Sequence, residues 1–333
     1  MSLRVSVLVV NYQAGPHLAR CLDQLTKQTI LDFEVIVVDN GSEDGSLALA
    51  REAVGNDDRF TFVVAEANLG FAAGNNRAAA LAKAPLLALL NPDAFAAPDW
   101  LESLLVAAER YPDVAMFGST QLNAADPKVL DGAGDHYFAL GLPWRGGFGW
   151  PATSLPGEGE VFAPCAAAAL YRRDAFASVA GFDERFFCYV EDVDLAFRLR
   201  LRGHRCVQVP SAVVHHVGGG SANFVSGFAQ YHGMRNMVWC FVKNIPAPLF
   251  WLLLPLHLLT VFLVATRAAI FHGPDSWRGL MDGLRRIPWQ ARRQEQAQRK
   301  TPWYRLAAKM VWSPRLYATR APFLFRRNLR TNE

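Results

Sequence analysis

Three carboxylates lie close together in the segment YVEDVDLAFRLRLR, residues 189–202. Glu191, Asp192 and Asp194 open a helical pattern whose apolar residues are separated by arginines. Clustered carboxylates repel one another and resist desolvation, so a fold that gathers three of them often uses one on a metal ion, as a base or on a substrate hydroxyl. A purely structural interpretation is about equally open, because acids stabilise a helix N-terminus and Asp194 can pair with Arg198 one turn later.

Further polar candidates follow apolar runs in the first third of the chain. Apolar runs at 5–10, 33–38, 60–64 and 86–90 predict buried strands, and helical patterns follow at 17–27, 46–54, 71–83 and 98–111. This alternation predicts an α/β fold with a mostly parallel sheet flanked by helices, whose ligands bind at the carboxyl ends of the strands. Those ends carry Asn11, Asp39, Asn68 and the turn Asn91-Pro92-Asp93. Each is an ordinary turn residue alone, but four on one sheet edge predict a polar rim for a polar ligand.

The phosphate-binding motifs of many nucleotide enzymes are absent from the sequence. No GxGxxG follows the first strand pattern, and no GxxxxGK[ST] occurs. Asp93, at a strand end beside a rigid proline, offers another way to bind phosphates, because a single carboxylate can hold Mg²⁺ or Mn²⁺ together with substrate phosphates. His215 or His216, downstream, could complete the metal site, and imidazole suits Mn²⁺ better than Mg²⁺.

The middle of the chain, roughly residues 119–162, combines glycines with aromatic residues that include Trp144. Two interpretations are open. The segment could be a mobile binding loop or hairpin lid whose rings stack on a ligand, or a surface hairpin packed by its own aromatics.

Length, charge and cysteine content narrow the class of protein. The 333 residues suffice for one large α/β domain with an appendage, or for two domains. The net charge of +4 divides into +11 for residues 267–333 and −7 for the remainder, which indicates an acidic body and a basic tail. The five cysteines form no CxxC pair, which fits a reducing cytosol, and we expect no signal peptide.

A long apolar segment precedes the basic tail. Leu249–Ala265 contains seventeen residues without a charge, at the low end for a membrane-spanning helix, and Pro255 and His257 weaken that interpretation further. The basic, tryptophan-rich stretch that follows favours association with an anionic membrane surface. It lacks a recognised nucleic-acid motif, so we expect no nucleic-acid partner. The apolar segment could also be a buried core or dimer helix.

Seven motifs, in order over residues 5–221, together resemble glycosyltransferase family 2 with the GT-A fold, in its rhamnosyltransferase and galactofuranosyltransferase-like branch. They are VSVLVVNY (5–12), VVDNGSEDGS (37–46), ANLGFAAGNN (67–76), LLNPDA (89–94), AGFDERFF (180–187), YVEDVDLAFRLRLRGH (189–204) and VVHHVGGGS (213–221). Any one of them alone would be a weak signal.

The resemblance implies a role for each matching position. The nucleotide-sugar donor would contact Asn11, Asp39, Asn68, Gly70, Asn75, Asn91 and Asp93. Asp93 matches the last acid of the family's DXD motif and would bind Mg²⁺ or Mn²⁺. Alignment favours His215 as the second metal ligand, although the His215-His216 doublet leaves the choice open.

The resemblance also divides the carboxylate cluster. Asp192 matches the general base, which inverting transfer requires near the acceptor hydroxyl, and Glu191 would raise its pKa. Glu191, Asp194 and Trp144 are expected at the acceptor, although Glu191 and Asp194 could instead pair with arginines. Cys165 and Ala166 stand where many relatives have a glycine, and Ala180 stands in place of the first glycine of a Gly-Gly pair.

These observations predict an inverting, metal-dependent glycosyltransferase with a GT-A domain at 1–225 and a helical, membrane-associating region at 226–333. It would transfer a sugar from a donor such as dTDP-rhamnose or a UDP-hexose to a lipid-linked or cell-surface glycan, at the cytoplasmic face of the membrane. A sugar nucleotidyltransferase is an alternative, but its loop after the first strand would normally carry basic residues, and none occurs here before Arg20. A non-catalytic glycan- or nucleotide-binding protein is the other alternative.

Overall fold

A computed structural model describes residues 3–218 and 227–325 of the chain. Its strands are β1 (Val5–Asn11), β2 (Phe33–Asp39), β3 (Phe60–Val64), β4 (Leu86–Leu90), β5 (Ala94–Ala96), β6 (Met116–Asn123), β7 (Leu130–Ala133), β8 (Asp135–Phe138), β9 (Leu142–Arg145), β10 (Gly159–Glu160), β11 (Ala168–Arg172) and β12 (Cys206–His216). Its α-helices are α1 (Pro16–Thr26), α2 (Ser46–Val54), α3 (Gly70–Leu81), α4 (Trp100–Arg110), α5 (Arg173–Ser178), α6 (Glu191–Leu201), α7 (Phe228–Asn244), α8 (Leu249–His272), α9 (Asp275–Arg285), α10 (Trp289–Ala297), α11 (Trp303–Ala307) and α12 (Pro314–Thr319).

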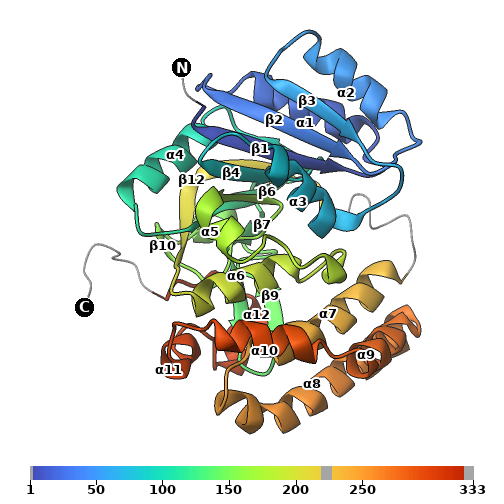
Figure 1. Ribbon diagram of the computed structural model, residues 1–333, viewed down its shortest axis with the longest axis vertical. Helices are drawn as coiled ribbons and strands as arrows, with labels where there is room; N and C mark the ends of the chain where they lie inside the picture. The colour runs from blue at the N-terminus through green and yellow to red at the C-terminus, as the bar shows by residue number, and fades with distance from the viewer. Residues whose placement is uncertain (1–2, 219–226, 326–333) are drawn as a thin grey trace.

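One mixed sheet forms the upper part of the molecule (Figure 1). Its main path runs β10-β12-β6-β11-β4-β1-β2-β3, while β5 pairs with β12 and β7 with β6. The first four strands are mutually parallel, as predicted, and β11 enters antiparallel between β4 and β6. The residues of β1, β2 and β4 are all buried, as expected for strands with helices on both faces. The predicted α/β architecture is therefore confirmed.

Strand β12 is much longer than the apolar run at 206–209 with which it begins. The strand continues to His216 through an irregularity between Val209 and Val213, where its pairing with β6 changes register. Pro210 interrupts the apolar pattern there, so the second half of the strand was not evident from the sequence. Both histidines of the doublet therefore belong to a strand.

Part of the glycine-rich middle segment forms the two-stranded hairpin β8–β9, apart from the main sheet, whereas β7 and β10 of the same segment belong to the main sheet. Its aromatic side chains are covered by the end of the described chain: Trp144 lies edge-on to Tyr317, and Phe138 stacks on the same ring. The hairpin is therefore buried against the C-terminal region, which differs from the second interpretation of a surface hairpin packed by its own aromatics.

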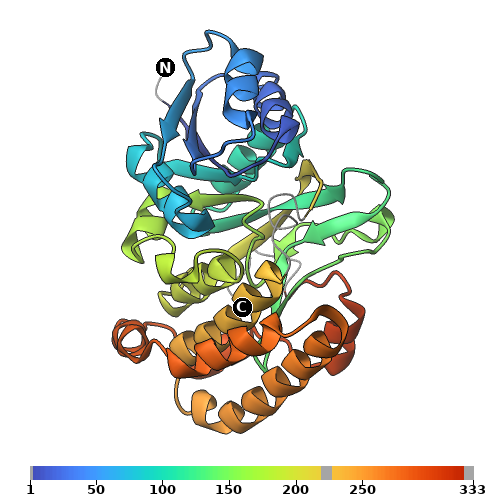
Figure 2. The same cartoon turned by 90° about the vertical axis from the view of Figure 1, so that its right-hand side faces the viewer.

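The helices α7 to α12 gather below the sheet (Figure 2). Helix α7 contacts α6, α8, α9 and α10, so this region packs directly against the helix that begins with the carboxylate cluster. The predicted domain boundary at 225/226 falls outside the described residues and stays a prediction.

Candidate active site at the strand ends

Asn11 and Asp39 are register partners at the ends of the parallel strands β1 and β2. The Asn11 Nδ2 donates to Asp39 Oδ1 at 2.6 Å and to the hydroxyls of Ser42 and Ser46 at 3.1 and 2.9 Å. The other Asp39 oxygen accepts from the backbone N–H of Ser42 at 3.0 Å. Both side chains are buried, so in this structure they hold the loop after β2 in place. Their contact with a nucleotide stays a prediction.

The turn before α3 brings Asn68 and Gly70 to the same edge. Asn68 Oδ1 accepts from the backbone N–H of Gly70 at 2.9 Å and from Asn40 Nδ2 at 3.4 Å. Gly70 has φ +82°, and a Cβ there would lie 2.5 Å from the Phe187 ring, so the position requires glycine. Asn75 is buried within α3 and donates to the carbonyl of Phe71, which bonds it to its own helix.

The Asn91-Pro92-Asp93 turn lies next to the end of β12. The pairing of Ala94 in β5 with His216 in β12 brings Asp93 beside that strand, and the Asp93 carbonyl accepts from the N–H of Val217 at 3.0 Å. The Asp93 carboxylate Oδ1 lies 3.3 Å from His216 Nε2. Asn91 Oδ1 is buried and makes no hydrogen bond to the residues that the structure describes.

The structure places His216, rather than the favoured His215, beside Asp93. Successive residues of a strand face opposite sides, so only one histidine of a doublet can reach a given group. His216 is buried, and its Nδ1 lies 2.7 Å from Asp131 Oδ2, while His215 is more exposed. Burial lowers the pKa of His216, but the hydrogen bond to Asp131 and the Asp93 carboxylate outweigh it and raise the pKa to about 9.

Asp131 and Arg145 belong to this cluster and were not predicted. Asp131, in β7, accepts from both His216 and the Arg145 guanidinium. The Arg145 stem lies against Gly132, where an added Cβ would meet it at 2.5 Å. The glycines of the middle segment were the only sequence signal for this close packing.

The cluster fits a hard divalent cation. Asp93 offers an oxygen and His216 a nitrogen whose partner nitrogen is already bound to a carboxylate, the arrangement by which proteins orient a metal-ligating imidazole. In octahedral coordination, metal–ligand bonds of about 2.1 Å place neighbouring ligand atoms about 3 Å apart. The distance of 3.3 Å between Asp93 Oδ1 and His216 Nε2 is close to this value.

Asp192 lies in the first turn of α6, just after a strained loop. Tyr189 and Val190 have φ of +70° and +67°, a region that non-glycine residues rarely occupy. The Asn236 Nδ2 from α7 donates to the carbonyls of Phe186, Cys188 and Tyr189 at 2.7–2.9 Å. Asn236, which the sequence gave no reason to single out, therefore holds the loop in this conformation.

The Asp192 carboxylate is held by two backbone N–H groups. Ala166 donates to its Oδ2 at 3.2 Å and Val193 to its Oδ1 at 2.8 Å. Burial raises the pKa of Asp192, although these hydrogen bonds and Arg145 oppose the rise. Glu191 is more deeply buried, and burial together with the Asp192 charge raises its pKa well above the usual range. Burial, more than Glu191, thus raises the pKa of Asp192.

Asp194 and Trp144 are not placed to contact an acceptor, and both expectations need correction. Asp194 is 0% exposed and bonds to Arg198 at 2.8 Å, Lys243 at 2.9 Å and Asn244 at 2.8 Å. The pairing with Arg198 was the structural alternative, and it is confirmed. Trp144 is buried among the hairpin aromatics, so its ring has no free face for a sugar.

We expect Asp194→Asn to lower the free energy of unfolding by about 3 kcal/mol, because it removes one anion from buried cations. Urea unfolding followed by tryptophan fluorescence measures the change. Asp23→Asn is the matched control: its partner Lys27 also lies four residues on, but both side chains are largely exposed, so the loss should stay below about 1 kcal/mol. Equal losses for the two variants would contradict the structural role of Asp194.

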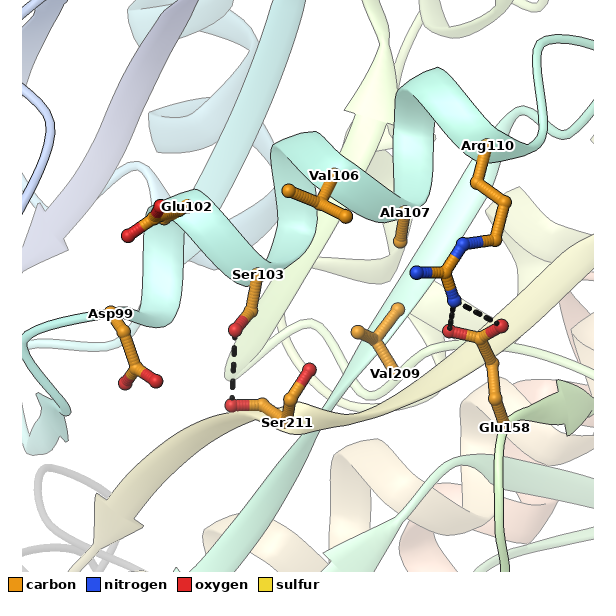
Figure 3. Close-up of a pocket in the computed structure, with 9 residues that line it drawn as sticks. All are labelled: Asp99, Glu102, Ser103, Val106, Ala107, Arg110, Glu158, Val209 and Ser211. Carbon is orange, nitrogen blue, oxygen red and sulfur yellow. Dashed lines mark hydrogen bonds and ion pairs between the residues drawn. The ribbon is translucent and has the colours of Figure 1, made fainter.

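A surface hollow of about 260 Å³ lies elsewhere, between α4 and the middle of β12 (Figure 3). Arg110 closes one end of it through an ion pair with Glu158, and Ser103 bonds to the carbonyl of Ser211. None of the predicted site residues lines it, so we assign the chemistry to the strand ends.

Comparisons with known proteins identify the family to which the chain belongs. The chain is 34% identical over 241 residues to the N-acetylglucosaminyl-diphospho-decaprenol L-rhamnosyltransferase of Mycobacterium tuberculosis, covering 63% of this chain and 75% of that protein. It is 32% identical over 228 residues to the O-antigen biosynthesis protein RfbC of Myxococcus xanthus, covering 63% of this chain but 17% of that protein.

Solved structures with a similar fold include the mannosyltransferase PcManGT of Pyrobaculum calidifontis in complex with GDP-Man and Mn²⁺, with a TM-score of 0.53 and 19% identity. S. aureus TarS 1–349 in complex with UDP gives a TM-score of 0.57 and 16% identity, and both matches cover 89% of this chain and 88% of the other. The family model "Glycosyl transferase family 2" matches residues 6–179. The chain therefore belongs to glycosyltransferase family 2.

Proposed function

We propose that the protein transfers a sugar, with inversion, from a nucleotide diphosphate donor to a hydroxyl of a lipid-linked glycan. The observation that carries this proposal is the presence of two acidic groups whose charges both act on Arg145, one through Asp131 and the other at Asp192. A buried Asp93–His216–Asp131 cluster is suited to a cation and a diphosphate, and Asp192 is suited to an acceptor hydroxyl. The Mycobacterium tuberculosis relative makes dTDP-rhamnose the first donor to test and a lipid-linked N-acetylglucosamine the first acceptor.

In an inverting displacement, the residues of the site would have separate roles. Asp192 accepts the proton of the acceptor hydroxyl, and the N–H groups of Ala166 and Val193 fix the direction of its carboxylate. Asp93 and His216 would hold Mg²⁺ or Mn²⁺, which when bound neutralises charge on the leaving diphosphate. Asp131 keeps the His216 ring in place through Nδ1.

A donor panel tests the proposed function. Purified protein with Mn²⁺ is incubated with dTDP-rhamnose, UDP-hexoses and GDP-mannose, with and without a short-chain N-acetylglucosaminyl diphosphate lipid, and products are read by mass spectrometry. The proposal expects a new glycosyl-lipid and release of the nucleoside diphosphate. Release of pyrophosphate from nucleoside triphosphates, without glycosyl transfer, would instead support a nucleotidyltransferase.

Helix α8 supports a membrane-bound location. By length and composition it could cross a membrane, yet one stripe of it is buried against the protein: Leu249, Leu253, His257, Val261 and Ala265 recur every four residues. The opposite face exposes large apolar side chains, among them Trp251, Leu252, Leu259, Leu263 and Ile270.

The packing of α8 favours a helix that lies in the plane of the membrane surface. Helix α9 packs against α8 and carries Arg278, Asp282 and Arg285. If α8 crossed the membrane, these charged residues would be brought toward the hydrocarbon interior, which is unfavourable. An in-plane helix buries only its exposed apolar face, and the basic tail then meets anionic headgroups. The free cysteines of the chain favour the cytoplasmic face, where thiols stay reduced.

We expect Leu252→Glu to weaken binding to anionic phospholipid vesicles by about tenfold or more, since burying a leucine contributes about 1.5–3 kcal/mol. Vesicle co-sedimentation measures the binding. Leu31→Glu is the control, because Leu31 is equally exposed (73% against 70%) but lies in the loop before β2. If both variants sediment like the unaltered protein, α8 is not the membrane face.

A further inference from the structure

A further carboxyl group, that of Asp135, lies beside the predicted base and has no role in the mechanism above. Asp135 opens β8 and is fixed by backbone hydrogen bonds in both directions with Ala163, at 2.8 and 3.1 Å. Asp135 as a whole is only 7% exposed to solvent. Its Oδ1 is buried and makes no hydrogen bond with the described residues. Leaving a buried acceptor unpaired costs about 1–3 kcal/mol, so this atom calls for a partner that a ligand could supply.

The carboxyl group of Asp135 lies close to that of the predicted base. One oxygen of Asp135, one oxygen of Asp192 and the Cys165 sulfur all lie within 4.8 Å of one another. Burial and the charge of Asp192 raise the pKa of Asp135 well above the usual range, although Arg145 opposes the rise. This shift favours the neutral acid form of Asp135, which can both donate and accept a hydrogen bond, while Asp192 is the group with two fixed N–H donors.

These two carboxyl groups differ in what they can offer a sugar. Asp192 must accept the proton of the attacking hydroxyl. A hydroxyl that also accepted a hydrogen bond from Asp135 would be a weaker nucleophile, so Asp135 is better matched to a second polar group. The separation of the two carboxyl oxygens suits adjacent substituents on one sugar ring, each held at an ordinary hydrogen-bond distance of about 2.7 Å.

We propose that Asp135 binds the hydroxyl or amide next to the attacking hydroxyl, and so selects acceptors that present two adjacent polar groups. The inference rests on the proposed function and goes beyond it, because it names the feature of the acceptor that the site reads. The proposal also explains why the hairpin is buried. Strand β8 supplies the residue that binds the acceptor, and the aromatic residues of the hairpin pack it against the rest of the protein.

The test compares Asp135→Ala with the unaltered protein on a glycosyl-lipid acceptor and on its monodeoxy variants, each lacking one ring hydroxyl. The acceptor is the one that the unaltered protein uses best among short-chain N-acetylglucosaminyl diphosphate lipids and related glycans. We expect Asp135→Ala to lower kcat/KM about 10–100-fold on the complete acceptor, the loss that corresponds to one buried hydrogen bond. On one monodeoxy acceptor the two proteins should turn over equally slowly, because the partner of Asp135 is then absent from the substrate. If the adjacent group is the acetamide, an acceptor without that amide shows the same equality.

The KM for the donor and the slow hydrolysis of the donor should be unchanged in Asp135→Ala, because the proposal places Asp135 at the acceptor and not at the donor. Asp135→Asn keeps the shape and hydrogen-bonding capacity of a neutral acid, so it should retain most of the activity and serves if the alanine variant does not fold. The same loss for Asp135→Ala on every acceptor overturns the inference alone. No transfer by the unaltered protein to any acceptor overturns the proposed function together with it.

Discussion

Asp192→Asn is expected to lower kcat for glycosyl transfer by about 10²–10⁴-fold, the usual contribution of a positioned general base. Asparagine preserves the size of the side chain, and its amide oxygen can still accept from the N–H of Ala166 or Val193. What it removes is the ability to take a proton. Initial rates with saturating donor and acceptor measure the change, and vesicle-bound protein is compared at equal concentration.

Two further results separate a missing base from a damaged fold. Asp58→Asn, at an exposed carboxylate in the loop between α2 and β3, should leave kcat unchanged. In the unaltered protein, activity should fall as the pH drops through the pKa of Asp192, and burial raises that pKa, so the acid limb begins above the ordinary range of an aspartate. A loss below about tenfold in Asp192→Asn, or an unchanged acid limb, would contradict the assignment.

His216→Ala and His215→Ala are expected to differ sharply, although the residues are neighbours. His216→Ala should weaken Mn²⁺ binding by at least about 100-fold, because even the outer partners of metal ligands contribute about 10–100-fold. His215→Ala, on the other side of the strand, should change it less than about threefold. Electron paramagnetic resonance of free Mn²⁺ measures binding without any need for turnover.

The second histidine variant is the control for the first, since both remove one imidazole from β12. Asp131→Asn adds an intermediate case: it keeps a hydrogen-bond acceptor for His216 Nδ1 but loses the charge, so a loss of about tenfold is expected. Equal losses for both histidines, or a larger loss for His215→Ala, would return the ligand assignment to His215.

The strand ends could be predicted because the apolar runs of a doubly covered sheet are visible in the sequence. Asn11 and Asp39 follow two such runs, and their contact follows from parallel pairing without any knowledge of the side chains. The position of Asp192 in the first turn of α6 was likewise evident, since the carboxylates directly precede the helical pattern.

What could not be predicted depends on residues that are distant in sequence. Which histidine faces Asp93 depends on the irregularity in β12, since a shift of one residue reverses the two sides of a strand. Asp131, Asp135 and Arg145 belong to short strands without a clear apolar alternation. The pairing of Asp194 with Lys243 joins residues 49 apart, so the acceptor role inferred from local sequence was wrong.

Helix α7 connects the active-site loop to helix α8. On one side its Asn236 holds the strained loop before Asp192 and its Lys243 and Asn244 hold Asp194. On the other side its Phe241 stacks on His257 of α8, with ring centroids 3.9 Å apart. In the proposed orientation of α8 on the bilayer, helix α7 would set how far above the lipid the acceptor hydroxyl must stand. Glycans whose reactive sugar is nearer to or farther from the lipid anchor would then be excluded by reach, independently of their chemistry.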